Sequence, residues 1–483
     1  MRQPILSVKS LCCRYARAES NALTNVSFSV DPGEFLCITG KSGSGKSTLA
    51  RCLLGILPRI FHADLSGEVL LEGGPVADIP TWQIGAQAGV VLQNPDTQLL
   101  AHTAEDDIAL ALHHSGVDAN EIPARTNWAL QAAGAAPFRA RPVRELSAGQ
   151  KQRAVMATAL ARRPSVLILD EPFSMLDPLG VAETLESVVA LHRQYGLTIL
   201  LLEHRIERVL DFATRAVVLE QGRVAYDGAP HWLSDGAFSR QYGLRNAALL
   251  RSQFERIWPT MRMQKVGAEA KGLTYAYPGQ HPAIERLLFA VPCGATAIVQ
   301  GRNGVGKTTL LKQFTGLLKP SRGQVWLGGT DVASLSRPAL TQHVGYVPQI
   351  PQHMFHQKTV RAELARNGPA ERGGDASTDT EAVLAQCDLQ HVSNRHPLSL
   401  SGGEARRLAI AMASAKRPSL VLLDEPTIGM DGRRLAMFLE LLAQLQERGT
   451  TVMLASNDTG LLSLPFENRI RLAHDHGAVP PVT

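Results

Sequence analysis

Cysteine, aromatic residues and an excess of charge are all scarce in this chain. Its 483 residues include six cysteines, with no CxxC pair and no Cys/His pair at zinc spacing, so a disulfide scaffold and a zinc or iron–sulfur site are not expected. We interpret the cysteines as small buried side chains in a reducing compartment. Aromatic residues make up 5% of the chain and the formal net charge is +5, from 49 basic and 44 acidic residues. Neither value favours a surface that binds nucleic acid.

Long hydrophobic runs are also missing. The longest apolar stretches, such as residues 197–202 and 166–169, have the length of a strand, whereas a membrane-spanning helix needs about 18 or more apolar residues. The first residues contain no apolar stretch long enough for a signal peptide. We therefore expect that the chain does not cross a membrane, and that any membrane span it works with belongs to another chain.

What the sequence does contain is an internal duplication. Three motifs occur twice in the same order, which predicts two homologous domains. We place the first domain at residues 5–228 and the second at 266–473. The segment between them, 229–265, is expected to be partly helical, and 474–483 to form a flexible tail. The paired motifs are GKSGSGKST at 40–48 and GRNGVGKTT at 301–309, LSAGQKQR at 146–153 and LSGGEARR at 400–407, and VLILDEP at 166–172 and LVLLDEP at 420–426.

Each half alternates short apolar strands with helices. Continuous Val/Ile/Leu strands of this kind indicate a parallel sheet that is covered on both faces, and hence an α/β fold. In each half a strand runs into a glycine-rich loop, and an Ala- and Leu-rich helix precedes a strand that ends in Asp-Glu. The predicted strands include 35–39, 198–202, 296–300 and 451–454, and the predicted helices include 150–161 and 405–415.

The two glycine-rich loops match the pattern GxxxxGK[ST], which predicts ATP binding. Glycines let successive backbone N–H groups face the phosphates, and the following helix directs its positive N-terminus at the same anion. The lysines are predicted to reach the β- and γ-phosphates, and Ser47 and Thr308 to ligate Mg²⁺. The predicted ATP-binding residues of the loops are Gly40, Ser42, Gly43, Gly45, Lys46, Ser47 and Thr48, and Gly301, Asn303, Gly304, Gly306, Lys307, Thr308 and Thr309.

An acidic pair closes an apolar strand in each half. Asp170 and Asp424 are predicted to bind Mg²⁺ through water. Glu171 and Glu425 follow them directly, and a carboxylate at this place can orient or polarise the attacking water of a phosphoryl transfer. We predict both glutamates to be catalytic.

Together with LSAGQ and LSGGE, this motif set resembles the ATP-binding-cassette (ABC) ATPases over nearly the whole chain. The resemblance implies tandem P-loop NTPase cassettes, each with a mainly parallel sheet core, an antiparallel β part and a helical subdomain that carries the signature motif. It also implies that Tyr15 and Tyr277 stack on adenine. Gln93 and Gln349 would contact Mg²⁺ and the nucleotide and link to a membrane partner, and His204 would be the catalytic switch histidine.

In this family two cassettes close head to tail, so that each ATP lies between one phosphate loop and the signature of the other cassette. The resemblance implies that Ser147 and Gly149 in the first signature, and Ser401, Gly402 and Gly403 in the second, contact nucleotide. The two sites depart from symmetry, because Asn457 occupies the position of the switch histidine and Ala148 replaces a signature glycine. Both departures fall in the site built on Lys307. We predict that the site built on Lys46 performs most hydrolysis and that the other mainly binds ATP.

Within the family, the first half looks most like the energy-coupling-factor (ECF) importers of vitamins and transition-metal ions, above all in the run QNPDTQL at 93–99. We expect a motor that uses ATP and Mg²⁺ and works with separate transmembrane coupling and capture subunits, peripherally on the cytoplasmic face of a bacterial inner membrane. The cassettes would pair within one chain, and a higher oligomer is compatible with this prediction. Two alternatives stay open: a soluble tandem ATPase that acts on ribosomes or nucleic acid, and the ATPase of a peptide- or nickel-type importer.

Apolar residues follow each of the two loop glutamines. Leu99 and Leu100 come after Gln93, and Met354 and Phe355 come after Gln349. We expect the membrane partners to dock beside these loops. The sequence does not identify the transported substrate.

Overall fold

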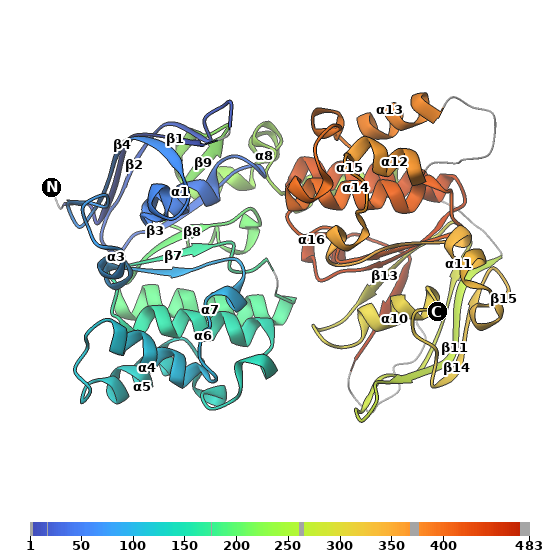
Figure 1. Ribbon diagram of the computed structural model, residues 1–483, viewed down its shortest axis with the longest axis horizontal. Coiled ribbons are helices and arrows are strands. Elements are labelled where there is room, and N and C mark those ends of the chain that lie inside the picture. The colour runs from blue at the N-terminus through green and yellow to red at the C-terminus, as the bar shows by residue number, and fades with distance from the viewer. Residues whose placement is uncertain (1–2, 17, 175, 260–264, 368–375, 474–483) are drawn as a thin grey trace. The chain divides into compact units, whose positions relative to one another are not determined.

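The computed structural model describes residues 3–16, 18–174, 176–259, 265–367 and 376–473. The chain divides into two compact units (Figure 1). Unit one comprises Met1–Asn246 together with Asp431–Arg433, and unit two comprises Ala247–Met430 and Arg434–Thr483. The tail expected at 474–483 lies outside the described residues.

The core of unit one is a six-stranded sheet. All its neighbouring strands run parallel except one antiparallel pair at an edge, formed by the last two strands of the unit. The strands are β3 (Phe35–Thr39), β6 (Ala88–Val91), β7 (Val166–Asp170), β8 (Thr198–Leu202), β9 (Arg215–Glu220) and β10 (Arg223–Gly228), in the order β10-β9-β3-β8-β7-β6.

Two apolar layers cover this sheet, one on each face. Side chains alternate along a strand, so Cys37 and Leu201 pack into the core below α6 and α7, while Leu36 and Leu200 pack toward α1. Figure 1 shows these helices on opposite faces of the sheet. Both faces are therefore buried, which explains why the strands read as continuous apolar runs. The helices of unit one are α1 (Lys46–Leu53), α2 (Ile56–Arg59), α3 (Thr81–Gln87), α4 (Ala104–His114), α5 (Ile122–Ala132), α6 (Ala148–Ala161), α7 (Pro178–Tyr195) and α8 (Gly236–Tyr242).

A second, antiparallel sheet packs over α1 and shares its core. At the β1–β4 pairing, Gly67 has a φ of +88°, and a Cβ there would lie 2.4 Å from the Ser10 carbonyl oxygen. Gly323 of unit two meets the Gly272 carbonyl in the same way. Both glycines allow a close approach of two backbones that no other residue permits. The strands are β1 (Leu6–Tyr15), β2 (Leu23–Val30), β4 (Ala63–Leu71) and β5 (Gly74–Pro75), in the order β2-β1-β4-β5.

Unit two repeats this arrangement. Its core sheet is parallel throughout, with β13 (Thr296–Gln300), β16 (Val344–Val347), β17 (Leu420–Asp424), β18 (Thr451–Ala455) and β19 (Asn468–Arg471) in the order β16-β17-β18-β13-β19. Its antiparallel sheet contains β11 (Val266–Ala276), β12 (Pro282–Pro292), β14 (Arg322–Leu327) and β15 (Thr330–Asp331), in the order β12-β11-β14-β15.

The helices of unit two begin with one that precedes the duplicated motifs. Phe254 in this helix, α9, stacks on Trp258, which follows the helix, and packs edge-on against Phe466. The helices are α9 (Ala247–Ile257), α10 (Lys307–Phe314), α11 (Arg337–His343), α12 (Val360–Asn367), α13 (Ala376–Gln386), α14 (Gly402–Ala415), α15 (Gly432–Glu447) and α16 (Thr459–Leu462).

The predicted α/β fold with two parallel cores is confirmed. The predicted signature helices are confirmed as well, but α6 and α14 begin two or three residues before the predicted start. The reason is that Ser147 and Ser401 each form a capping box with the residue three positions later, so the glycine-containing turn is already helical.

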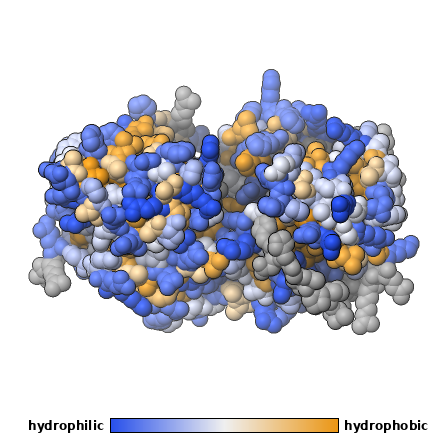
Figure 2. All heavy atoms as spheres, turned by 90° about the horizontal axis from the view of Figure 1, so that it is seen from below, coloured by the Kyte–Doolittle hydropathy of each residue, from blue (hydrophilic) through white to orange (hydrophobic). Residues whose placement is uncertain are grey.

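No helix in the described part of the chain has the length and apolar character needed to cross a bilayer. On the face drawn in Figure 2, apolar residues lie in separate small patches among hydrophilic ones.

We predict that Leu167→Ala destabilises unit one by about 2–5 kcal/mol, because it leaves a cavity in the core. Leu167 lies on β7 with none of its surface exposed. The control is Leu179→Ala, at a leucine that is 45% exposed, which should change stability by less than about 0.5 kcal/mol. Denaturant unfolding followed by circular dichroism measures both, and equal effects would contradict the assignment of β7 to the core.

Candidate active site

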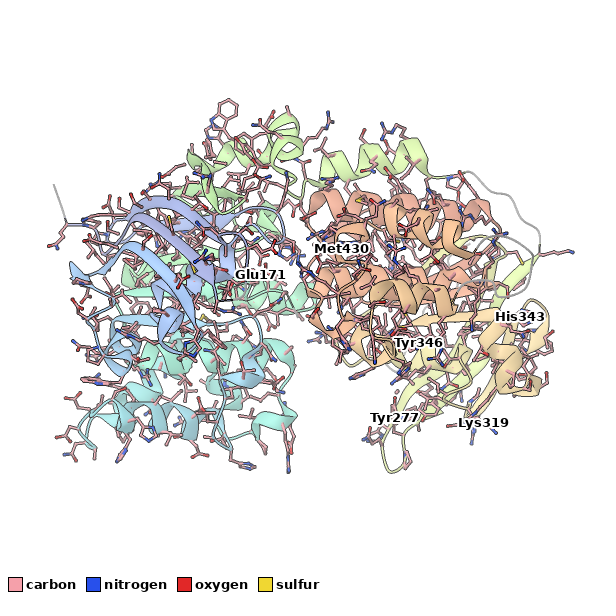
Figure 3. All side chains as sticks on the ribbon, turned by 45° about the horizontal axis from the view of Figure 1, so that its top comes forward. Glu171, Tyr277, Lys319, His343, Tyr346 and Met430 are labelled. Atoms are coloured by element: carbon pink, nitrogen blue, oxygen red, sulfur yellow. The ribbon has the colours of Figure 1, made fainter. Side chains whose placement is uncertain are left out.

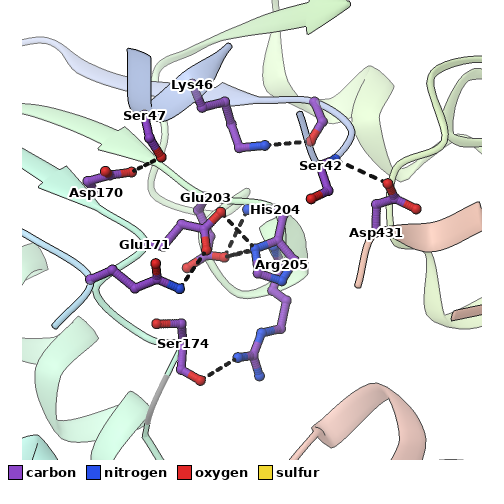
Figure 4. A network of polar contacts seen from close by, with 12 residues as sticks. Ser42, Lys46, Ser47, Asp170, Glu171, Ser174, Glu203, His204, Arg205 and Asp431 are labelled. Carbon is purple, nitrogen blue, oxygen red and sulfur yellow. Dashed lines mark hydrogen bonds and ion pairs between the residues drawn. The ribbon is translucent and has the colours of Figure 1, made fainter. Parts of the chain in front are cut away.

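The candidate site of unit one lies at the carboxyl ends of β3, β7 and β8, which are neighbours in the sheet (Figure 4). The loop after β3 leads into α1, which begins at Lys46 and follows Gly45 in a left-handed conformation with a φ of 104°. The Lys46 Nζ donates hydrogen bonds to the carbonyl oxygens of Gly40 (2.8 Å) and Lys41 (3.1 Å). The ammonium group is thus held inside the curl of the loop, where the phosphates of a nucleotide are predicted to lie.

A hydroxyl and a carboxylate lie beside this lysine. The Ser47 Oγ donates a hydrogen bond to Asp170 Oδ1 at 3.4 Å. Burial, and after it the charge of the neighbouring Glu171, raises the pKa of Asp170 to about 6. Burial lowers the pKa of Lys46, although the surrounding carboxylates counteract it. Asp170 is thus a buried carboxylate whose ionised form a bound cation would stabilise.

Glu171 is the centre of a second cluster. Its Oε1 lies 3.3 Å from the Nδ1 of His204, and its Oε2 accepts a hydrogen bond from Gln93 Nε2 at 3.4 Å. Burial alone would raise the pKa of Glu171, but the charge and hydrogen bond of His204, with Lys46 and Arg205, lower it to about 2. The carboxylate is therefore ionised at neutral pH. Glu171 lies inside unit one in Figure 3.

The predicted adenine-stacking tyrosines lie beside the phosphate-loop helices. The Tyr15 hydroxyl lies 3.2 Å from Thr48 Oγ1, and the Tyr277 hydroxyl lies 3.1 Å from Thr309 Oγ1. Tyr277 is at the hairpin end of the antiparallel sheet of unit two (Figure 3). In unit one, the Ser42 N–H donates a hydrogen bond to Asp431 Oδ2 at 3.1 Å.

The equivalent site of unit two has the same framework but different contacts. Lys307 Nζ donates to the Gly301 carbonyl oxygen (2.8 Å), and also to the Asn457 Oδ1 (3.0 Å). Asn457 Nδ2 donates in turn to Asn303 Oδ1 at 2.5 Å. The Thr308 hydroxyl donates to Asp424 Oδ2 at 2.7 Å. Asn457 thus binds the loop lysine directly, which His204 does not do in unit one.

Glu425 has an environment opposite to that of Glu171. Burial raises its pKa to about 7, because Lys307, 3.9 Å away, and the Asn457 N–H offset only part of the desolvation. The Gln349 side chain is exposed, and its carbonyl oxygen accepts a hydrogen bond from Arg406 (2.9 Å). A base with a pKa near 7 is partly protonated at neutral pH, whereas Glu171 is not.

The signature residues lie at helix N-termini. Ser147 caps α6 and Ser401 caps α14, so Gly149, Gly402 and Gly403 lie in first turns whose N–H groups are free of helical partners. A Cβ at Gly402, the counterpart of Ala148, would meet no atom within 4 Å in the structure. Any hindrance by Ala148 would therefore have to come from a bound molecule.

Two features of the sites differ from the sequence analysis or were missed by it. Phe355, expected at a docking surface, is 8% exposed and belongs to the core of unit two, whereas Ile350 is 53% exposed. Glu203, directly before His204, is fully buried at the site and was not predicted. The only sequence signal was an acidic residue at the end of an apolar strand, where burial is not expected without a partner.

The donor sets fit Mg²⁺ and a nucleotide. Hydroxyl and carboxylate oxygens at Ser47 and Asp170, and at Thr308 and Asp424, are the hard ligands that Mg²⁺ prefers. In the described ranges, no group of three or more His, Cys, Asp or Glu residues is arranged to hold a metal ion by itself.

Comparison with known proteins agrees with this geometry. The sequence matches the family described as "ABC transporter" at residues 23–174 and 284–428. The chain belongs to the ABC transporter family. It is an ABC transporter ATPase with two cassettes, and the ranges matched contain the phosphate loop, signature and acidic strand of each unit.

Relatives of this ABC ATPase match over nearly its whole length. "Putative ABC transporter ATP-binding protein TTE1589" of Caldanaerobacter subterraneus is 32% identical, over 97% of this chain and 89% of the relative. "Putative HMP/thiamine import ATP-binding protein YkoD" of Bacillus subtilis is 31% identical, over 98% of this chain and 90% of the relative. The solved structure of cbiO1 from Clostridium perfringens, described as part of the ABC transporter complex cbiONQ, is 30% identical, with a TM-score of 0.44 over 53% of this chain and 96% of that one.

We predict opposite stability effects for the same substitution at the two glutamates. The folded-state pKa of Glu171 is lowered to about 2, so its ionisation stabilises the fold above about pH 4.5, and Glu171→Gln should lower the melting temperature at pH 8. The folded-state pKa of Glu425 is raised to about 7, so its ionisation costs stability as the pH rises from about 4.5 to 7. Glu425→Gln should therefore raise the melting temperature at pH 8, by roughly 3 °C or more.

Thermal unfolding without nucleotide or Mg²⁺, at pH 5 and pH 8, measures both effects. The Glu425→Gln difference should shrink at pH 5, because most of the cost of ionising Glu425 in the fold arises only as the pH rises from about 4.5 to 7. The Glu171→Gln difference should persist at pH 5, because its stabilisation is lost only as the pH falls toward about 2. Shifts of the same sign at pH 8 would show that the two environments are not opposite.

Proposed function

We propose that this ABC ATPase is the motor of a membrane importer, which couples ATP binding and Mg²⁺-dependent hydrolysis to the uptake of a small nutrient through separate transmembrane subunits. The observation that carries this proposal is the similarity over nearly the whole chain to a relative named for HMP/thiamine import. The run QNPDTQL, which resembles ECF importers, supports it. We infer a vitamin, a vitamin precursor or a transition-metal ion as the substrate class, and a peripheral position on the cytoplasmic face of the membrane.

In the proposed reaction, the backbone N–H groups of each loop and its lysine hold the phosphates, and a hydroxyl and an aspartate hold Mg²⁺, which neutralises developing charge when bound. Glu171 orients the attacking water and is ionised for this role. His204 lies against Glu171 at 3.3 Å and is placed to contact the terminal phosphate. Tyr15 and Tyr277 stack on the adenine. Gln93 and Gln349 contact Mg²⁺ and the nucleotide and link the site to the membrane partner.

We further propose that the two sites are unequal. In unit two the histidine position holds Asn457, which binds Lys307, and Glu425 has a pKa near neutrality. Because Glu425 is partly protonated at neutral pH, less of it is ionised and able to act as a base. Because Lys307 donates a hydrogen bond to Asn457, it is less available to the phosphates. The site built on Lys46 then performs most of the hydrolysis, while the site built on Lys307 mainly binds ATP and keeps the cassettes closed.

Glu171→Gln should reduce ATP turnover of the assembled transporter by about tenfold or more, because it removes the base without dismantling the phosphate cradle. Glu425→Gln should leave a substantial part, with a loss of less than about twofold. A phosphate-release assay gives turnover, and binding of a fluorescent ATP analogue checks that both variants retain nucleotide. Equal losses, or a larger loss for Glu425→Gln, would contradict the asymmetry.

The loop after Gln93 is the proposed docking surface in unit one. Leu100 is 81% exposed, whereas Leu99 packs against the core. Asp107 on α4 is 4% exposed and accepts hydrogen bonds from the N–H groups of Leu100 (2.8 Å) and Ala101 (3.1 Å). Its other oxygen accepts one from Thr158 on the signature helix α6 (3.0 Å). The loop that presents Leu100 is thus tied to the helix that is predicted to contact nucleotide.

We predict that Leu100→Asp releases the chain from its membrane partners and leaves it folded. The chain, tagged, is purified from membranes in mild detergent, and co-purifying multi-span proteins are identified by mass spectrometry. The control is Leu288→Asp, at a leucine of the antiparallel sheet of unit two that is 67% exposed, which should remain bound. Retention of the partners by Leu100→Asp would exclude this loop as the docking site, and the absence of any multi-span partner from the wild type would contradict the importer.

A further inference from the structure

Glu203 is a buried carboxylate that the proposed reaction does not use. It is the first residue after β8 and none of its surface is exposed. Its Oε1 accepts hydrogen bonds from the backbone N–H groups of His204 (2.8 Å) and Arg205 (2.9 Å). These two bonds fix the carboxylate in one orientation at the edge of the active site (Figure 4).

The same oxygen faces the imidazole of His204. Nδ1 of that ring lies 3.2 Å from Glu203 Oε1 and 3.3 Å from Glu171 Oε1. A ring nitrogen between two carboxylates acts as a donor, so the proton belongs on Nδ1. The other ring nitrogen, Nε2, is buried and has no hydrogen-bond partner in the part of the chain that the structure describes. The contacts thus leave Nε2 available to a ligand.

The charge of Glu203 also acts on the phosphate loop. It is one of the carboxylates that raise the pKa of Lys46 against the effect of burial. Burial, and after it Glu203, raises the pKa of the Cys37 thiol on β3 to about 12. Glu203 is therefore part of the electrostatic environment of the site and not only of the turn that follows β8.

Unit two shows that the turn forms without this carboxylate. Ser456 occupies the position of Glu203, and its N–H donates to the Val299 carbonyl oxygen (3.2 Å), as the N–H of Glu203 does to that of Ile38 (3.0 Å). The Ser456 hydroxyl accepts the Asp458 N–H at 3.1 Å. Unit two therefore has neither the glutamate nor the histidine at these two positions, although the backbone of its turn makes the same hydrogen bond to the neighbouring strand.

We propose that Glu203 is a positioning residue for ATP hydrolysis in unit one, which holds the Nδ1–H of His204 and fixes the orientation of the ring, so that Nε2, when it carries a proton, can donate to the terminal phosphate. This inference rests on the role proposed above for His204. A carboxylate behind an imidazole orients the ring through Nδ1–H and stabilises its protonated form. Because Glu203 holds the ring permanently, Glu171 is free to orient water during turnover.

The first test is Glu203→Gln in the full chain, a substitution that keeps the size of the side chain and an acceptor oxygen for the two backbone N–H groups but removes the charge. ATP turnover should fall about tenfold, while affinity for an ATP analogue stays within about twofold of the wild type. Ser456→Ala, the matched change in unit two, should alter turnover by less than about twofold. Full turnover in Glu203→Gln would overturn the proposal.

The second test measures directly whether the ring nitrogen Nδ1 of His204 carries a proton. With ¹⁵N-labelled histidine, the NMR signal of His204, assigned by its loss in His204→Asn, should report a protonated Nδ1 in the wild type and a partial loss of that proton in Glu203→Gln. An unchanged Nδ1 proton would overturn the proposal, because Glu203 would then only stabilise the turn. If Glu203→Gln does not fold, Glu203→Ser, which introduces the residue of unit two, replaces it. If neither folds, Glu203 is a structural residue and the proposal is wrong.

The third test separates this inference from the role of His204. In a His204→Asn background, Glu203→Gln should cause no further loss of turnover, because Glu203 acts through the ring; an additional loss would contradict the proposal. If His204→Asn alone turns over at the wild-type rate, the proposed role of His204 fails, and with it the catalytic part of this inference. The NMR measurement then still decides whether Glu203 holds the proton on Nδ1.

Discussion

The burial of a parallel sheet between two apolar layers is the constraint on which both sites of this protein depend. Parallel strands end at the same edge, and polar residues can follow a strand only where it leaves the core. In unit one the order β3-β8-β7 places the phosphate loop, the pair Glu203–His204 and the pair Asp170–Glu171 side by side. In unit two β13, β18 and β17 do the same. The candidate catalytic groups meet because the strands are packed.

This shared frame carries two different electrostatic environments. Glu171 lies beside a histidine and an arginine, and its pKa is lowered to about 2. Glu425 has an asparagine at the histidine position, and burial raises its pKa to about 7. Desolvation acts on both carboxylates, so the difference comes from the neighbouring charges. A few side chains at strand ends therefore change the chemistry of a site while the backbone stays the same.

Buried carboxylates also organise the loops around each site. Asp107 ties the loop that follows Gln93 to the signature helix, and Glu363 of unit two accepts the N–H groups of His356 and Gln357 in the equivalent loop. Such residues cost desolvation energy unless several donors satisfy them, which limits how far the loop can move without breaking those bonds. A partner that presses on the loop would thus act on the signature helix through Asp107.

The sequence alone determined the duplication, the parallel cores, the strand ends and the loop residues, because these follow from local patterns: apolar runs, glycines before GK[ST] and Asp-Glu after a strand. It also located the substitution of histidine by Asn457. Only the tertiary structure decided that Glu203 is buried against His204, that Phe355 belongs to the core and that Leu100 is exposed. These properties depend on which strands are neighbours and on what packs over each loop, and such long-range contacts leave no periodic signal in the chain.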